Sequence, residues 1–305
     1  MLYLSVFLRK GGLKMYGCKK DTALISNVLG YASLFSMALW FIVSFAAKKI
    51  AVLHAEYLSV FRIIWLAVFV LPALWGTWRL RRMSNGLPPL PAKAGLNKKL
   101  AVMLSTFGVI VIMRILYASV FPSAVETFGV HAGMTATELF LLFWISTLAS
   151  SIAEEVFFRG FFLRSMRIFR PSLAVLMSAL VFALMRFSVE GFPLYFVAGL
   201  LIGMAYVATN SLSAVIGISF LCKAFLFLEE TVRVYVPEGY MLLMQGGLVI
   251  CVLLSASGLP YLRENMRAFF ENDDENAIPS SYFWTMPTVL FIALAAGIQI
   301  FLQPK

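Results

Sequence analysis

Long, almost uncharged apolar runs recur along the chain, and short segments between them hold most of the charged residues. The runs show no alternation of polar and apolar positions, so they predict helices rather than the strands of a membrane barrel. Each run approaches the roughly 20 residues that one membrane-spanning helix needs. We expect an all-α polytopic transmembrane bundle of about eight to nine spans, the fifth to seventh being short and enclosed within the bundle. The nine candidates are 23–47, 57–78, 100–121, 136–158, 172–187, 193–209, 212–228, 240–258 and 283–303.

Composition supports a membrane protein. Apolar residues make up 61% of the chain and charged residues 13%, whereas soluble domains are about 45–50% apolar and about 25% charged. Cys18, Cys222 and Cys251 form no disulfide framework. The net charge of +10 could suggest a nucleic-acid partner. We exclude that partner because the basic residues cluster at the ends of the apolar runs, where they act as topology signals.

The distribution of basic residues also predicts the orientation. With the N-terminus in the cytoplasm, most of the Lys and Arg residues outside the spans fall on the cytoplasmic side. We therefore expect an integral cell-membrane protein with a cytoplasmic N-terminus, and a bacterial inner membrane is the expected location. Residues 1–22 form a cytoplasmic lead, 23–99 hold two spans and a Pro- and Gly-rich linker, 100–228 form a core, and 229–305 hold the last spans.

Charged residues inside the spans are candidates for function, since charge in a bilayer is costly. For Arg62 and Arg114 we expect snorkelling toward the interface or structural pairing with a carboxylate. The remaining intramembrane charges lie in the core.

Glu154 and Glu155 are adjacent near the inner end of the fourth span. Neighbouring helical residues point about 100° apart, so the two carboxylates face different directions. Arg159 lies four residues after Glu155, which suits an ion pair along the helix. Glu154 then faces the bundle interior, where a buried carboxylate suits a general base. The alternative is a charge cluster at the helix end with ordinary interfacial solvation.

Three segments resemble one family in order and spacing. EEVFFR (154–159) matches the EExxxR motif of the CPBP (CAAX protease and bacteriocin-processing, or Abi) family, which includes the type II CAAX prenyl endopeptidases. SALVFALMR (178–186) resembles its FxxxH region, and 195–225 resembles the two following helices with the HxxxN or HxxxD motif. The resemblance covers roughly 148–225, so we expect 100–228 to be a CPBP-like core.

The resemblance implies an intramembrane endopeptidase in which the first glutamate activates a water and motif histidines position it. The retained candidates are Glu154, Glu155 and Arg159, and Phe182 matches the Phe of the second motif. Such enzymes cut peptide bonds near the membrane surface, typically after a prenylated cysteine.

The polar residues of the second and third motifs are replaced. Arg186 and Ser219 stand at the two His positions, and Lys223 stands at the Asn or Asp position. His54 and His131, the two histidines of the chain, fall in outer loops and are not expected to reach the glutamates. We expect no metal and no other cofactor, because a zinc site lacks its usual His ligands.

These substitutions predict a salt-bridge network. An arginine has no acceptor and is always protonated, so Arg186 would hold Glu154 ionised and occupied. Lys223 could do the same for either glutamate. A rival interpretation is a Ser219–Lys223 nucleophilic dyad, since the two residues lie one helical turn apart.

Three functions follow. The first is a catalytically impaired CPBP-like protein that binds or scaffolds a membrane substrate. The second is an active CAAX-type endopeptidase that uses Glu154 with altered partners. The third is an unrelated transporter with a coincidental motif. The expected partners are membrane lipids and a membrane or lipidated protein or peptide.

Overall fold

The computed structural model describes residues 19–51, 58–83, 94–122, 127–167, 169–271 and 283–301, and every regular element within them is helical. Cys18, His54 and most of the Pro- and Gly-rich linker lie outside these residues. The helices are α2 (Lys19–Ala51), α3 (Leu58–Met83), α4 (Leu96–Val120), α5 (Ala136–Phe143), η3 (Trp144–Ala149), α6 (Ser150–Glu155), η4 (Val156–Leu163), α7 (Arg164–Met166), α8 (Pro171–Leu184), α9 (Phe192–Thr209), α10 (Leu212–Tyr235), α11 (Pro237–Glu271) and α12 (Met286–Phe301).

The expected all-α membrane bundle is confirmed. Seven described helical segments are long and apolar enough to cross a membrane, and two shorter apolar helices, α8 and α12, accompany them. Of the three spans expected to be short, the fifth is short, since α8 has 14 residues. The seventh is not, since α10 has 24 residues. The last span is the other short one, since α12 has 16 residues.

The fourth span also differs from its expected end. It continues past Phe158 to Met166 as one rod made of α5, η3, α6, η4 and α7. Glu154 and Glu155 therefore lie well inside the rod and not near its end. The expected span ended at Phe158, directly before the charged Arg159, but the structure buries Arg159 completely.

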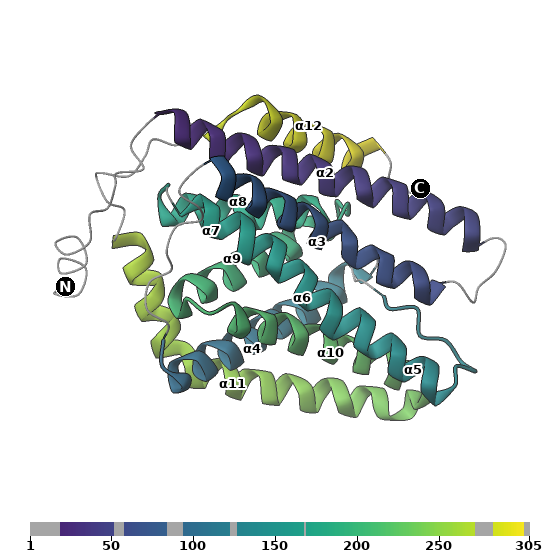
Figure 1. The fold of residues 1–305 in the computed structure, drawn as a ribbon. Helices are drawn as coiled ribbons and strands as arrows, with labels where there is room; N and C mark the ends of the chain where they lie inside the picture. Colours follow the sequence, from purple (N-terminus) through teal and green to yellow (C-terminus); the bar gives the residue numbers. More distant parts are fainter. Residues whose placement is uncertain are drawn as a thin grey trace.

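The rod lies between two outer groups of helices. On one side α2 packs against α3 and α12, and on the other α4 packs against α11 (Figure 1). Helices α8, α9 and α10 complete the centre, with α10 contacting α6 and α8 contacting η4. Small residues allow the outer helices to approach closely: a Cβ atom at Gly108 would lie 2.5 Å from the Cys251 carbonyl oxygen.

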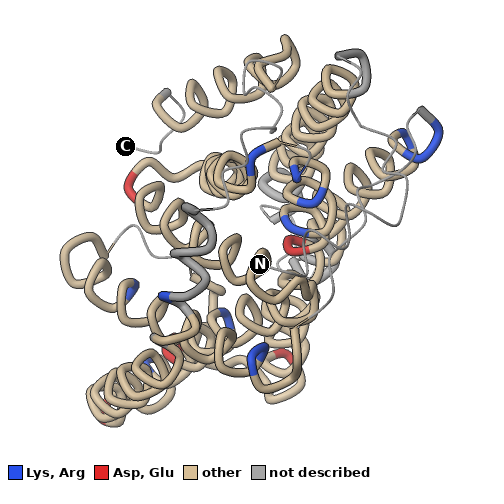
Figure 2. The backbone as a smooth tube through the Cα atoms, turned by 90° about the vertical axis from the view of Figure 1, so that its left-hand side faces the viewer, with Lys and Arg blue, Asp and Glu red and all other residues tan. Residues whose placement is uncertain are grey.

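Charged residues are few along the described helices (Figure 2), and seven of them are buried. They are Arg114, Glu154, Glu155, Arg159, Lys223, Glu229 and Glu230. Arg114 on α4 donates to Glu229 on α10 at 2.6 Å, so the structural pairing expected for Arg114 is present. The side chain of Arg62 lies outside the described structure.

Candidate functional site

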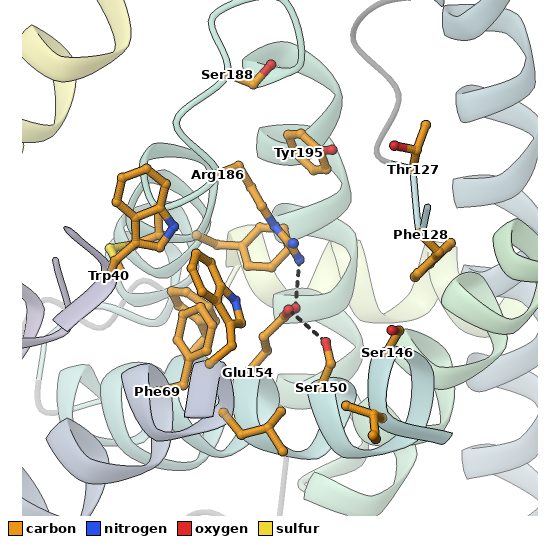
Figure 3. A pocket seen from close by; sticks show the side chains of 16 residues that line it. Trp40, Phe69, Thr127, Phe128, Ser146, Ser150, Glu154, Arg186, Ser188 and Tyr195 are labelled. Carbon is orange, nitrogen blue, oxygen red and sulfur yellow. Dashed lines mark hydrogen bonds and ion pairs between the residues drawn. The ribbon is translucent and has the colours of Figure 1, made fainter. Parts of the chain in front are cut away.

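Glu154 lies on α6 with both carboxylate oxygens engaged. Arg186 donates to Oε2 at 2.6 Å, and Lys223 donates to Oε1 at 2.7 Å. The Ser150 hydroxyl, one turn earlier, also donates to Oε1 at 3.2 Å. Figure 3 shows the carboxylate between Arg186 and Ser150. The ion pairs expected between Glu154 and the two substituted cations are therefore present.

The two cations reach Glu154 from different helices. Arg186 follows the end of α8, where Phe187 takes a left-handed backbone conformation with φ 48° and its ring packs 4.1 Å from that of Trp40. The Arg186 guanidinium lies 4.9 Å from the Phe182 ring centre and 5.3 Å from that of Tyr195. These contacts restrict the guanidinium to the side facing Glu154.

Lys223 lies on α10, and its ammonium group also contacts the Ser150 hydroxyl. One lysine thereby joins α10 to two positions of α6. Together with Arg186, it connects the rod to the helices on either side.

Glu155 belongs to a second polar group directly beside the first. Arg159 donates to its Oε1 at 3.3 Å, as the i,i+4 spacing predicted, and Ser219 on α10 donates to the same oxygen at 2.5 Å. The Arg159 guanidinium also donates to the Gly199 carbonyl at 3.1 Å and lies 4.9 Å from the Phe182 ring centre. Glu155 and Arg159 are both 0% exposed.

The Ser219–Lys223 dyad is absent from this arrangement. The Ser219 hydroxyl is directed to Glu155, whereas the Lys223 ammonium is directed to Glu154 and Ser150. A nucleophilic dyad needs the serine hydroxyl within hydrogen-bond reach of its base. The rival interpretation is therefore wrong for this conformation.

A metal ion does not fit the site either. Both oxygens of Glu154 are already occupied by cations, which would repel a metal. Among the residues that the structure describes, no three His, Cys, Asp or Glu side chains are grouped to hold a metal ion.

A cavity of about 560 Å³ opens beside Glu154. Its lining comes from α2, α3, the rod, the end of α8, α9 and the segment before α5. Figure 3 shows Trp40 and Phe69 on one side of Glu154, with Ser146, Thr127 and Phe128 on the other. The carboxylate thus lies where an aromatic wall meets a wall that carries hydroxyl groups.

Residues 135–225 match the family model described as Type II CAAX prenyl endopeptidase Rce1-like. The match covers less than a third of the chain, and over these residues the chain is similar to CPBP-family proteases. The match contains the rod, α8, α9 and the part of α10 that carries Ser219 and Lys223. No curated protein and no solved structure matches the chain.

Family and fold together identify an integral membrane protein that resembles CAAX proteases, and the CPBP match argues against the coincidental motif of an unrelated transporter. Glu154 and Glu155 lie between two π-helical stretches, η3 and η4, and such departures from a regular α-helix are frequent at functional sites. His131 lies in the loop before α5, where its carbonyl accepts from Tyr235 at 3.0 Å. It is not among the residues that line the cavity.

The sequence interpretation missed two buried acidic residues just beyond the matched region. Glu229 and Glu230 were placed after the end of the seventh span, but both are buried within α10. Glu229 pairs with Arg114. Glu230 accepts hydrogen bonds from the backbone amides of Phe128, Gly129 and Val130 at 2.6–3.0 Å.

Glu230 therefore positions one wall of the cavity, because Thr127 and Phe128 line it. The Phe128 ring also packs 5.7 Å from that of Phe227, one turn before Glu230 on α10. Lys223 and Glu230 are seven residues apart and so share a face of α10. The same helix face thus holds the carboxylate of Glu154 and the loop opposite it.

Replacing Glu230 with glutamine is expected to loosen this wall, since an amide offers one acceptor oxygen where the carboxylate offers two. The measurement is the labelling rate of Ser146→Cys by a water-soluble maleimide, in a chain whose three native cysteines are replaced by alanine. We expect labelling to accelerate several-fold. Glu229→Gln is the matched control, because Glu229 is the adjacent buried glutamate and makes none of the loop contacts. An equal acceleration in the control would indicate general loosening of α10 and contradict the role of Glu230.

Proposed function

We propose that this protein is a catalytically impaired member of its family that binds a membrane-embedded substrate or partner. The observation that supports this most directly is the double occupation of Glu154 by Arg186 and Lys223. A general base must accept a proton from water, and a carboxylate whose two oxygens are both paired with cations is a poor acceptor. Neither substituted cation can accept a proton in place of a motif histidine.

A binding role is supported by what the substitutions leave in place. The cavity beside Glu154 is within the size range of small-molecule sites, and its mixed walls suit an amphipathic chain. Membrane lipids and lipidated proteins or peptides are the proposed partners. We retain a cytoplasmic N-terminus and a bacterial inner membrane as part of this proposal.

Cleavage of a prenylated peptide by the purified protein in detergent tests the impairment. We expect no cleavage above that of Glu154→Ala. The triple variant Arg186→His, Ser219→His and Lys223→Asn, which restores the polar residues of the family motifs, is expected to gain Glu154-dependent cleavage. Cleavage by the unmodified protein that disappears in Glu154→Ala would overturn the proposal.

The second candidate is an active endopeptidase that uses Glu154 with altered partners. It is favoured by the position of Glu154 at a cavity that also presents Ser146 and Ser150. The same assay distinguishes the two candidates, because only the second predicts turnover by the unmodified protein.

A further inference from the structure

Helix α11 lies at the edge of the bundle, with α4 on its inner side (Figure 1). Among the seven described segments that could cross a membrane, its span Pro237–Gly258 is the least buried. Its outward face carries large apolar side chains, each at least half exposed: Met241, Leu242, Val249, Ile250, Val252 and Leu253. In a bilayer this face is covered either by lipid or by another membrane helix.

Gln245 interrupts the apolar face. Its side chain is exposed, and no hydrogen bond joins it to any described residue. At 1.5 Å per residue, it lies about 12 Å from the start of the span and about 20 Å from its end. That depth is within a hydrocarbon core roughly 30 Å thick, so the side chain is too short to reach either polar surface.

A carboxamide facing lipid tails is costly, because the tails offer neither a donor nor an acceptor. Gln299 on α12 shows how this chain satisfies an amide inside the bundle. It is buried, and its Nε2 donates to the carbonyls of Ala183 and Leu184, both at 3.2 Å. The exposed amide of Gln245 therefore indicates that a polar group from another molecule reaches the outward face of α11.

A second copy of the chain supplies a matching group at the correct depth. Copies of one membrane protein insert with the same orientation, so a two-fold axis along the membrane normal brings Gln245 of each copy to the same level. A carboxamide is both donor and acceptor, so two of them can exchange a pair of hydrogen bonds. At the adjacent Gly246, a Cβ atom would meet nothing within 4 Å, so a neighbouring helix could approach closely.

We propose that the outward face of α11 around Gln245 is a homodimer interface, in which the two carboxamides hydrogen-bond to each other across the two-fold axis. The interface is independent of the proposed function. Helix α11 contributes no residue to the lining of the cavity beside Glu154 and lies outside the residues that match the family model. Substitutions on this face should therefore leave the Glu154 site unchanged.

Energy transfer between separately labelled copies of the full-length protein in liposomes measures the association. Donor and acceptor dyes are attached at the C-terminus, and the ratio of lipid to protein is varied to obtain a dissociation constant. Gln245→Leu removes the carboxamide at similar size, and we expect about tenfold weaker association. Gln245→Asn keeps the carboxamide and should associate more tightly than the leucine variant. Ser257→Ala is the matched control, because Ser257 is also exposed on α11 but donates to the Leu254 carbonyl of its own helix.

Disulfide cross-linking tests where the copies meet. In a chain whose three native cysteines are replaced by alanine, Val249→Cys places a thiol one turn from Gln245 and is expected to cross-link two copies when isolated membranes are oxidised. Leu74→Cys, at a similarly exposed position on α3, should not cross-link. Equal energy transfer for the unmodified protein and Gln245→Leu, or none at any ratio, would overturn the interface. Cross-linking of Val249→Cys to a different protein alone would show another partner on this face and also overturn it.

Discussion

Replacing Arg159 with leucine is expected to lower the free energy of unfolding by about 3–5 kcal/mol, the cost of breaking a buried ion pair by removing one partner. The guanidinium is 0% exposed and connects Glu155 to the backbone of α9 through the Gly199 carbonyl. Leucine would leave the Glu155 carboxylate buried with only the Ser219 hydroxyl as a donor. It would also remove a cation that lies against the Phe182 ring.

The measurement is unfolding of the purified protein by SDS titration in mixed micelles, monitored by tryptophan fluorescence. Glu155→Gln combined with Arg159→Leu removes both charges, so we expect the double variant to be more stable than Arg159→Leu alone. Arg81→Leu, at an exposed position on α3, is the control. A loss below about 1 kcal/mol for Arg159→Leu would mean that the pair contributes no more than an exposed one.

The number and class of the helices could be predicted because a bilayer imposes a simple length rule on each apolar run. The ends could not be predicted in the same way. Glu229 and Glu230 looked like the polar end of a span, but their partners, Arg114 and the amides of residues 128–130, lie about a hundred positions away in the sequence. From the sequence alone, a glutamate is expected to face water unless its distant partner is known.

The candidate site also has contacts that the sequence could predict and contacts that it could not. The Glu155–Arg159 pair depends on helical spacing alone and could be predicted from residues four apart. The contacts of Arg186 and Lys223 with Glu154 could be predicted only through the family resemblance, which placed three helices around one point. The aromatic wall from α2 and α3 has no counterpart in the motifs, so no pattern connected Trp40 or Trp65 to Glu154.

The motifs could not predict the role of Ser150 either. It is an ordinary residue one turn before Glu154, and its importance comes from contact with Lys223 on another helix. The π-helical stretches on both sides of α6 alter which residues face inward. A regular 3.6-residue period therefore could not give the orientation of the whole rod.

Replacing Glu154 with leucine distinguishes the two proposed functions without any substrate. Where a carboxylate serves catalysis, its removal commonly leaves stability unchanged or raises it, because active sites trade stability for activity. Here Glu154 forms ion pairs with both Arg186 and Lys223, so we expect the same SDS titration to show a loss of about 3–5 kcal/mol. Adding Lys223→Met should recover part of that loss by removing one of the two cations that Glu154 no longer contacts. Glu238→Leu, at an exposed position at the start of α11, is the control. A Glu154→Leu protein as stable as the unmodified chain would contradict the anchoring role and favour the active endopeptidase.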